Sequence, residues 1–129
     1  ISNSGLEFTV DSAATISGHS DHKVTFDSVM ACAKWFRCKE VKEVYAYETV
    51  SETDFSNPFL GTTFIPNVYE NIENTFDEKL KILNIYSSEI SDFPFPRSID
   101  AITALAKRRG AESGYKLAES FMLVKLSRE

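Results

Sequence analysis

The stretch DHKVTFDSVMACAKWFRCKEVKEVYAYE, residues 21–48, contains the two patterns that predict the fold of this chain. From residue 22 onward, apolar side chains recur every three or four residues, which is the spacing of one helix face, and the pattern ends near residue 38. This face consists of Phe26, Val29, Met30, Ala33 and Phe36. The segment Val41–Glu48 then carries valines and aromatic residues, which are typical of a strand. A helix is therefore expected to lead directly into a strand.

A second candidate strand lies upstream of this helix. The run LEFTV, Leu6–Val10, is short, apolar and rich in β-branched and aromatic residues. Residues 11–21 follow it and are rich in Ser, Ala, Gly and Thr, which favours a loop. Strand, loop, helix and strand in this order are typical of two parallel strands joined by a crossover helix. The expected fold class is α/β, with a mostly parallel sheet flanked by helices.

The second half of the chain continues this alternation. A long polar loop, TVSETDFSNPFLGTTFIPN at residues 49–67, precedes a short candidate edge strand, VYENI. Apolar residues at helical spacing follow over residues 76–90, until the two prolines of SDFPFPRS interrupt the helix. Ser98 is a suitable N-cap for a further helix, which we expect to end near Gly110 and Gly114. The closing run ESFMLVKL predicts a last strand.

Composition and charge narrow the classes of function. The 129 residues carry a net charge of −5 with no long basic run, so neither a nucleic acid nor an anionic membrane is expected as a partner. No apolar run approaches the roughly 20 residues that a membrane span requires, and no secretory signal pattern is present. Cys32 and Cys38 lie six residues apart within the expected helix, too far apart for a comfortable disulfide. Two unpaired thiols favour a reducing, cytoplasmic location.

The two histidines of the chain, His19 and His22, lie three residues apart in the segment GHSDHKV, with Asp21 between them. This segment follows a predicted strand and opens a predicted helix, at the edge of the sheet where open α/β folds bind their ligands. The positive end of a helix favours the neutral imidazole that a metal requires, and a neighbouring carboxylate can select the tautomer. Zinc, however, takes three or four protein ligands. The pair is therefore either part of a metal site or two loop histidines without a ligand.

Five segments, taken together, resemble the C-terminal half of the LmbE-like, or PIG-L-like, zinc de-N-acetylases. They are GHSDHKVTFDSVM, VKEVYAYETVSETDF, FIPNVYENI, KLKILNIYSSE and PFPRSIDAITALAKRRGAESGYKLAESFMLV. Order and spacing match from about Leu6 to the end of the chain, and the H-x-D-H element and the PRS…LA…RG…G…AESF tail are the most specific parts. The resemblance implies a Rossmann-like domain that removes the acetyl group from an N-acetylglucosamine-type sugar or sugar conjugate with the help of Zn²⁺.

The resemblance also implies roles for individual residues. His22 corresponds to a zinc ligand, His19 to the histidine that stabilises or protonates the tetrahedral intermediate, and Asp21 to the aspartate that pairs with that histidine. In the family, an N-terminal A-H-P-D-D-E element supplies two further zinc ligands and the general base. This chain contains no such element and no third histidine. Residues 1–129 are therefore expected to be a single domain or the C-terminal part of one, without the N-terminal half.

Charged residues elsewhere are candidates for substrate binding. Glu48 and Thr49 follow a strand at the same expected sheet edge as His19, so they either line a sugar pocket or belong to an ordinary loop. Arg97 precedes a predicted helix, and it could face an anionic substrate such as a nucleotide sugar. Arg108 and Arg109 allow the same interpretation. The alternative is that these arginines are solvated charges near helix ends.

The remaining candidates concern loops and packing. Asn67 and Tyr69 are expected either to fix a loop or to meet a neighbouring subunit. Trp35 and Phe36 lie in a predicted helix and are expected in the core. The long loop contributes a possible lid that faces either the sugar or another subunit, formed by Phe55, Phe59 and Phe64.

Two hypotheses of different classes follow. In the first, the chain is part of a zinc-dependent amino-sugar de-N-acetylase, with His22 as a metal ligand and His19 and Asp21 as catalytic residues. In the second, the chain is catalytically silent and forms a homo-oligomer, because half of a Rossmann-like sheet would expose a strand edge and an apolar face. A nucleotide-binding module is a distant alternative, since the chain has no Gly-rich phosphate loop.

Overall fold

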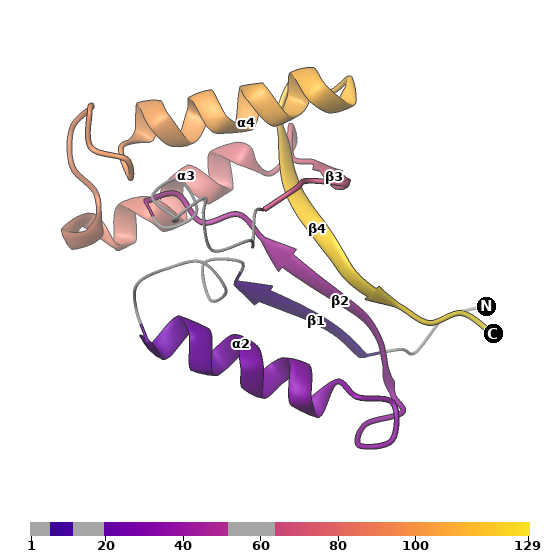
Figure 1. Ribbon diagram of the computed structural model, residues 1–129. Coiled ribbons are helices and arrows are strands. Elements are labelled where there is room, and N and C mark those ends of the chain that lie inside the picture. The colour runs from indigo at the N-terminus through magenta and orange to yellow at the C-terminus, as the bar shows by residue number, and fades with distance from the viewer. Residues whose placement is uncertain (1–5, 12–19, 52–63) are drawn as a thin grey trace. The chain divides into compact units, whose positions relative to one another are not determined.

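The computed structural model describes residues 6–11, 20–51 and 64–129, and for residues 6–11 and 20–23 it describes the backbone alone. This part of the chain contains both helices and strands, and the fold class is α/β, as predicted (Figure 1). The elements are β1 (Leu6–Asp11), α2 (Ser20–Cys32), β2 (Val41–Tyr47), β3 (Val68–Asn71), α3 (Phe76–Ile85), the 3₁₀ turn η3 (Ser87–Glu89), α4 (Ile99–Ser113) and β4 (Ala118–Leu126).

The four described strands form a mixed sheet in the order β1-β2-β4-β3. The parallel relation is confirmed for β1 and β2, whereas β4 runs antiparallel to β2. The backbone N–H of Asn67 donates to Phe121 O and that of Ile72 to Leu117 O, at 3.0 and 3.1 Å, so β3 is also antiparallel to β4. The expectation of a mostly parallel sheet is therefore corrected.

Connectivity explains the mixed sheet. One helix, α2, returns the chain from the end of β1 to the start of β2, and a single return of this kind makes the two strands parallel. Two successive helices, α3 and α4, separate β3 from β4. Because the second helix reverses the direction of the first, β4 begins at the end of the sheet where β3 stops.

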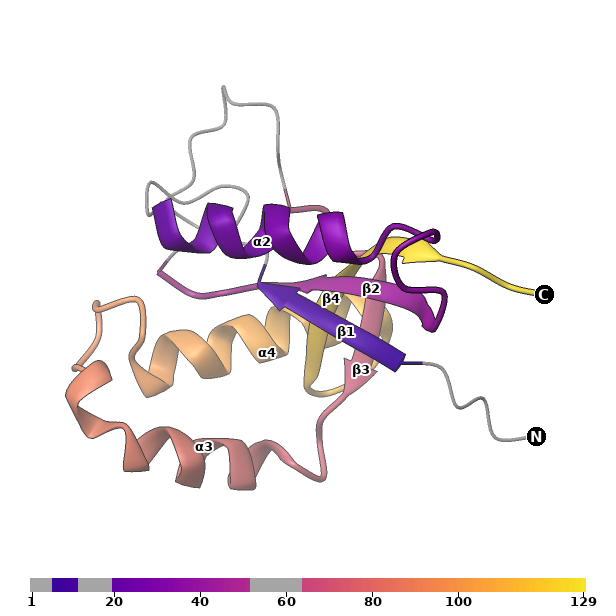
Figure 2. The same ribbon diagram turned by 90° about the horizontal axis from the view of Figure 1, so that it is seen from below.

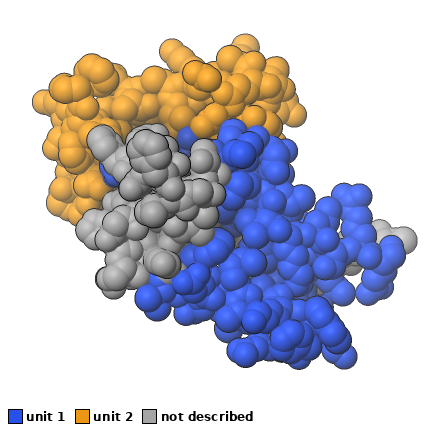
Figure 3. All heavy atoms as spheres, in the orientation of Figure 1, with its two compact units in different colours: residues 1–68, 121–129 blue, residues 69–120 orange. Residues whose placement is uncertain are grey.

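The chain divides into two compact units (Figure 3). Unit 1 comprises residues 1–68 and 121–129, and unit 2 comprises residues 69–120. The boundaries fall inside β3 and β4, so both strands pass from one unit to the other.

In unit 1, α2 lies along one face of β1 and β2 (Figure 2). The buried centre of this packing is formed by Ala33, Val41 and Val44. Partly buried side chains surround it, namely Phe26, Val29, Met30, Cys38 and Val124. The helix face predicted from the sequence is thus confirmed from Phe26 to Ala33, and removing these apolar side chains from water stabilises the unit.

The helix ends earlier than the apolar pattern predicts. Its last described helical bond joins the N–H of Ala33 to Val29 O at 2.8 Å, and the chain turns after Cys32. The ammonium of Lys125, on β4, then donates to Ala33 O at 2.6 Å and to Val41 O at 2.9 Å. A cation at this position satisfies a terminal helix carbonyl and is favoured by the helix dipole. A residue 92 positions away in sequence therefore stabilises the end of α2.

Two expectations that depended on a longer helix were wrong. Trp35 and Phe36 lie in the turn after α2 and are 70% and 61% exposed, not part of the core. Cys38 also lies beyond the helix, where its thiol donates to Glu40 Oε2 at 3.4 Å. Both cysteines are free, as predicted.

In unit 2, α3 and α4 pack around a core formed by Ile72, Phe76 and Ala106. The predicted N-cap is confirmed, because the hydroxyl of Ser98 accepts a hydrogen bond from Ala101 N at 3.1 Å. The predicted helix end is confirmed too: Gly114 adopts the left-handed conformation, with φ of 84°, that favours glycine at this cap.

No helix in the described part of the chain combines the length and the apolar character needed to cross a membrane.

Candidate functional site

The H-x-D-H element lies where β1 connects to α2. β1 ends at Asp11 and α2 begins at Ser20, so Asp21 and His22 fall in the first turn of the helix. Their side chains, and His19 as a whole, lie outside the described residues. The backbone nevertheless gives the element the setting that was predicted for it, between the carboxyl end of a parallel strand and the amino end of its crossover helix (Figure 1).

The end of β2 supplies the second part of this edge. The last register pair of the two parallel strands joins Asp11 to Tyr47, and Glu48 follows directly. Glu48 is half-buried and is engaged in an interaction, as is Thr49. Parallel strands end at a common edge, so Glu48 leaves β2 at the edge of the sheet where β1 ends.

Backbone strain occurs close to this edge. Ser51 has a φ of 72°, the only positive value of a non-glycine residue in the described part of the chain. A left-handed serine costs of order 1–2 kcal/mol unless local contacts compensate. Ser51 is itself engaged in an interaction.

Arg97, the other proposed substrate-binding residue, lies in unit 2 directly before the N-cap of α4. Its Nε donates to Glu89 O at 2.9 Å, and its guanidinium forms an ion pair with Glu89 Oε2 at 3.4 Å. The guanidinium also lies over the ring of Phe95, 5.2 Å from the centroid. These contacts orient Arg97 along the connection from η3 to α4. Glu48, in contrast, belongs to unit 1.

The paired arginines of α4 both form ion pairs with one carboxylate of the same helix. Arg108 Nε donates to Glu112 Oε1 at 2.9 Å, and Arg109 donates to Glu112 Oε2 at 2.8 Å. Hydrogen bonds from Arg109, and then from Arg108, lower the pKa of Glu112 below its ordinary value. The hydroxyl of Tyr69 donates to the same carboxylate at 3.3 Å. All four side chains are thus joined in one network within unit 2.

The loop candidates separate into two groups. Asn67 fixes the chain at β4, because its Oδ1 accepts a hydrogen bond from Leu123 N at 2.8 Å. The proposed aromatic lid is not assembled by the described residues: Phe64 is buried, and Phe55 and Phe59 lie outside the described part. A buried Phe64 contributes to packing and cannot serve as an open lid.

A zinc ion would not find a complete ligand set among the described residues. His22 can supply one ligand, and the sequence holds one further histidine. Among the side chains that the structure describes, those of residues 24–51 and 64–129, no three His, Cys, Asp or Glu are grouped closely enough to hold a metal. Zinc takes three or four protein ligands. The described side chains therefore do not form a zinc site by themselves.

The surface residues that sequence reasoning assigned wrongly are Trp35 and Phe36. They form an exposed, T-shaped aromatic pair with ring centroids 5.8 Å apart. The signal available in the sequence was the surrounding segment KWFRCK, in which cations flank both aromatics. A core helix rarely places three cations within six residues of its buried face.

Comparison of the chain with known proteins gives no match among family models, curated proteins or solved structures. The resemblance to the zinc de-N-acetylases therefore rests on the sequence segments alone.

Proposed function

We propose that this chain contributes the H-x-D-H part of the active site of a zinc-dependent de-N-acetylase acting on N-acetylglucosamine-type sugars or sugar conjugates. In this proposal His22 is a metal ligand, His19 and Asp21 act on the scissile amide, and Glu48 binds the sugar. β1, α2 and β2 are one parallel crossover of a Rossmann-like domain. The observation that carries the proposal is the position of the element, between the carboxyl end of β1 and the first turn of α2.

The chemistry assigned to the chain's own residues is proton transfer. Amide hydrolysis converts a neutral carbonyl into an oxyanion and finally releases an amine, which must gain a proton. An imidazolium stabilised by a neighbouring carboxylate can offset the oxyanion charge and then donate that proton. His19 and Asp21 are the pair proposed for this step. A bound zinc ion would polarise the carbonyl and activate water, and His22 would help to hold it.

The two histidines make a direct test possible. We would label the histidine ring nitrogens, titrate the chain with Zn²⁺ and follow both rings by NMR. We expect saturable shifts at the ring of His22, a response that survives in the His19→Ala variant and a loss of the response in His22→Ala. The metal assignment is refuted if His22 does not respond, or if His19→Ala removes binding as completely as His22→Ala does.

A second candidate function is favoured by the position of β1. This strand ends the sheet order, so one of its edges has no partner among the described strands. An unpaired strand edge can add a strand from another copy of the chain, which would make the protein a self-associating domain without catalysis. Sedimentation equilibrium, together with an assay of acetate release from N-acetylglucosamine compounds, separates the two candidates. A stable oligomer that neither responds to zinc nor releases acetate favours the silent domain.

A further inference from the structure

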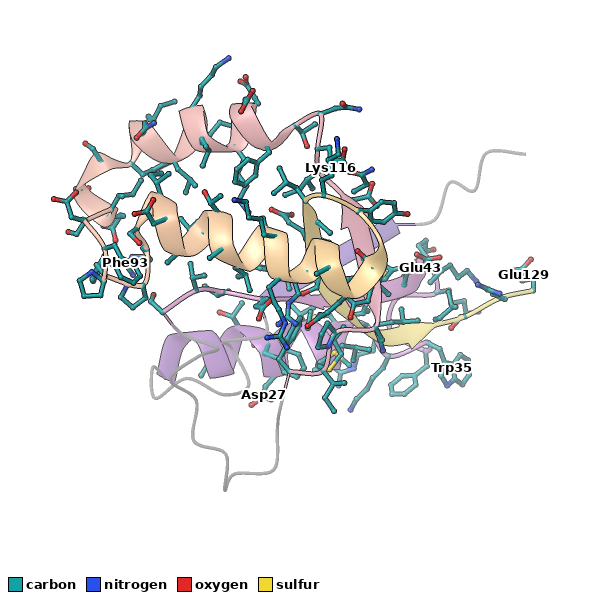
Figure 4. The ribbon with its side chains drawn as sticks, turned by 90° about the horizontal axis from the view of Figure 1, so that it is seen from above. Asp27, Trp35, Glu43, Phe93, Lys116 and Glu129 are labelled. Atoms are coloured by element: carbon teal, nitrogen blue, oxygen red, sulfur yellow. The ribbon has the colours of Figure 1, made fainter. Side chains whose placement is uncertain are left out.

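The turn between α2 and β2, residues 33–40, exposes two large aromatic side chains. Trp35 and Phe36 are 70% and 61% exposed, and Figure 4 shows the Trp35 side chain directed away from the ribbon. The two rings contact each other edge to face, with centroids 5.8 Å apart. Single exposed apolar residues are common, but two adjacent aromatics at the tip of one turn form a compact apolar projection.

The base of this turn is held by hydrogen bonds. Lys34 O accepts from Arg37 N at 2.8 Å and from Cys38 N at 3.1 Å. The ammonium of Lys125 joins the two ends of the turn, at Ala33 O and Val41 O. The backbone that carries the aromatic pair is thus already ordered. Binding of the pair to another surface would therefore cost little backbone conformational entropy.

The aromatics are surrounded by positive charge. Lys34, Arg37 and Lys39 are exposed and form no ion pair with another residue of the described part, and Glu40 is the one acidic residue of the turn. The pKa of the Glu40 carboxyl is lowered mainly by hydrogen bonds to its own backbone and to Cys38, and to a smaller extent by Lys39 and Lys42. The turn is therefore locally cationic on a chain whose net charge is −5.

Local charge, not net charge, governs binding at short range. Salt screens charges beyond about 8–10 Å at physiological ionic strength, so distant acidic residues weaken the field of this turn only slightly. The expectation that the chain avoids anionic membranes was drawn from the net charge and from the lack of a long basic run. That expectation did not consider that three exposed cations lie in the same turn as a tryptophan and a phenylalanine.

We propose that the turn, with Trp35 and Phe36 at its tip, binds peripherally to an anionic lipid surface. Tryptophan and phenylalanine insert into the boundary between headgroups and acyl chains, where aromatic rings are favoured. Lys34, Arg37 and Lys39 then face the anionic headgroups, with their methylene stems along the apolar layer. Each basic side chain near such a surface raises the partition coefficient roughly fivefold. The proposal does not depend on the hydrolase function and does not require a membrane span.

The sequence supplies its own probe, because Trp35 is the one tryptophan in the chain. We would add vesicles of neutral phospholipid, with and without phosphatidylserine, to the full chain and record tryptophan emission and co-sedimentation. We expect a blue shift and co-sedimentation with the anionic vesicles, both reduced by added salt. No blue shift with anionic vesicles, or equal binding to neutral vesicles at every salt concentration, overturns the proposal.

Variants can distinguish lipid binding by the cations of this turn from a general effect of removing positive charge. The double change Lys34→Gln/Arg37→Gln should weaken partitioning roughly 25-fold, by the fivefold factor for each charge. The matched control Lys107→Gln/Lys116→Gln removes two exposed cations of unit 2 and should leave partitioning nearly unchanged. Phe36→Ser keeps the probe and should also weaken binding. Equal losses in both double variants, or a blue shift that rises with protein concentration alone and accompanies dimers in sedimentation, refute lipid binding.

Discussion

Replacing Gly110 by alanine should destabilise the chain, although alanine is the better helix former. Gly110 lies in the last turn of α4 and is buried there. A Cβ at this position would meet Tyr115 O at 2.6 Å, Lys116 O at 2.8 Å and Lys116 C at 2.9 Å, whereas ordinary contact begins at 3.4 Å. All three atoms belong to the backbone that leads from α4 into β4, so no side-chain rotation can relieve the contact.

The expected change in the free energy of unfolding is the difference between two opposing effects. Alanine in place of glycine gains about 1 kcal/mol of helix propensity. Overpacking costs about 1–3 kcal/mol, and we take the upper value because three backbone atoms are met at once. The free energy of unfolding should therefore fall by about 2 kcal/mol, which lowers the folding equilibrium constant roughly 30-fold.

Urea denaturation followed by far-ultraviolet circular dichroism would measure this loss. The matched control is Ala104→Gly, at an exposed site in the middle of the same helix, which reports the propensity term alone. Gly114→Ala is a second control, since nothing lies within 4 Å of its Cβ position and only its positive φ opposes alanine. Unfolding of the Gly110→Ala variant at the same or a higher urea concentration than the parent chain would refute the steric argument.

Two further predictions concern charged residues. Lys125→Met should lower the free energy of unfolding by about 2 kcal/mol, because two carbonyls, Ala33 O and Val41 O, lose a charged donor, while Lys107→Met should have little effect in the same urea titration. Glu112 has a pKa below its ordinary value of 4.5, so its ionised form contributes stability that is present above pH 4.5 and is lost as the pH falls through the lowered pKa. Glu112→Gln should therefore flatten the acid limb of a plot of melting temperature against pH, and an unchanged acid limb would show that the bonds from Arg109 and Arg108 do not stabilise the fold.

The candidate site illustrates which relations sequence reasoning can supply. The setting of Asp21 and His22 follows from local patterns, because a strand, a polar loop and a helical repeat are consecutive in the chain. The shared edge of Glu48 follows from the parallel pairing that a single crossover helix imposes. A link between Glu48 and Arg97 does not follow from local patterns, because the two residues are 49 positions apart and belong to different units.

By itself, the sequence determined the features whose causes lie within a few residues. The strands β1, β2 and β4, the cap at Ser98 and the left-handed glycine at Gly114 depend on side-chain period, hydrogen-bonding capacity and allowed φ values, all of which are local. These features can be predicted from the sequence because each depends only on residues that are close to it in the chain.

Only the tertiary structure decided the strand directions and the end of α2. The antiparallel position of β4 results from two successive helices and from hydrogen bonds between segments far apart in sequence. The end of α2 depends on the ammonium of Lys125, which no local pattern near residue 33 reveals. This early end leaves Trp35 and Phe36 in solvent, because hydrophobic burial depends on what packs against a side chain and not on its place in a repeat.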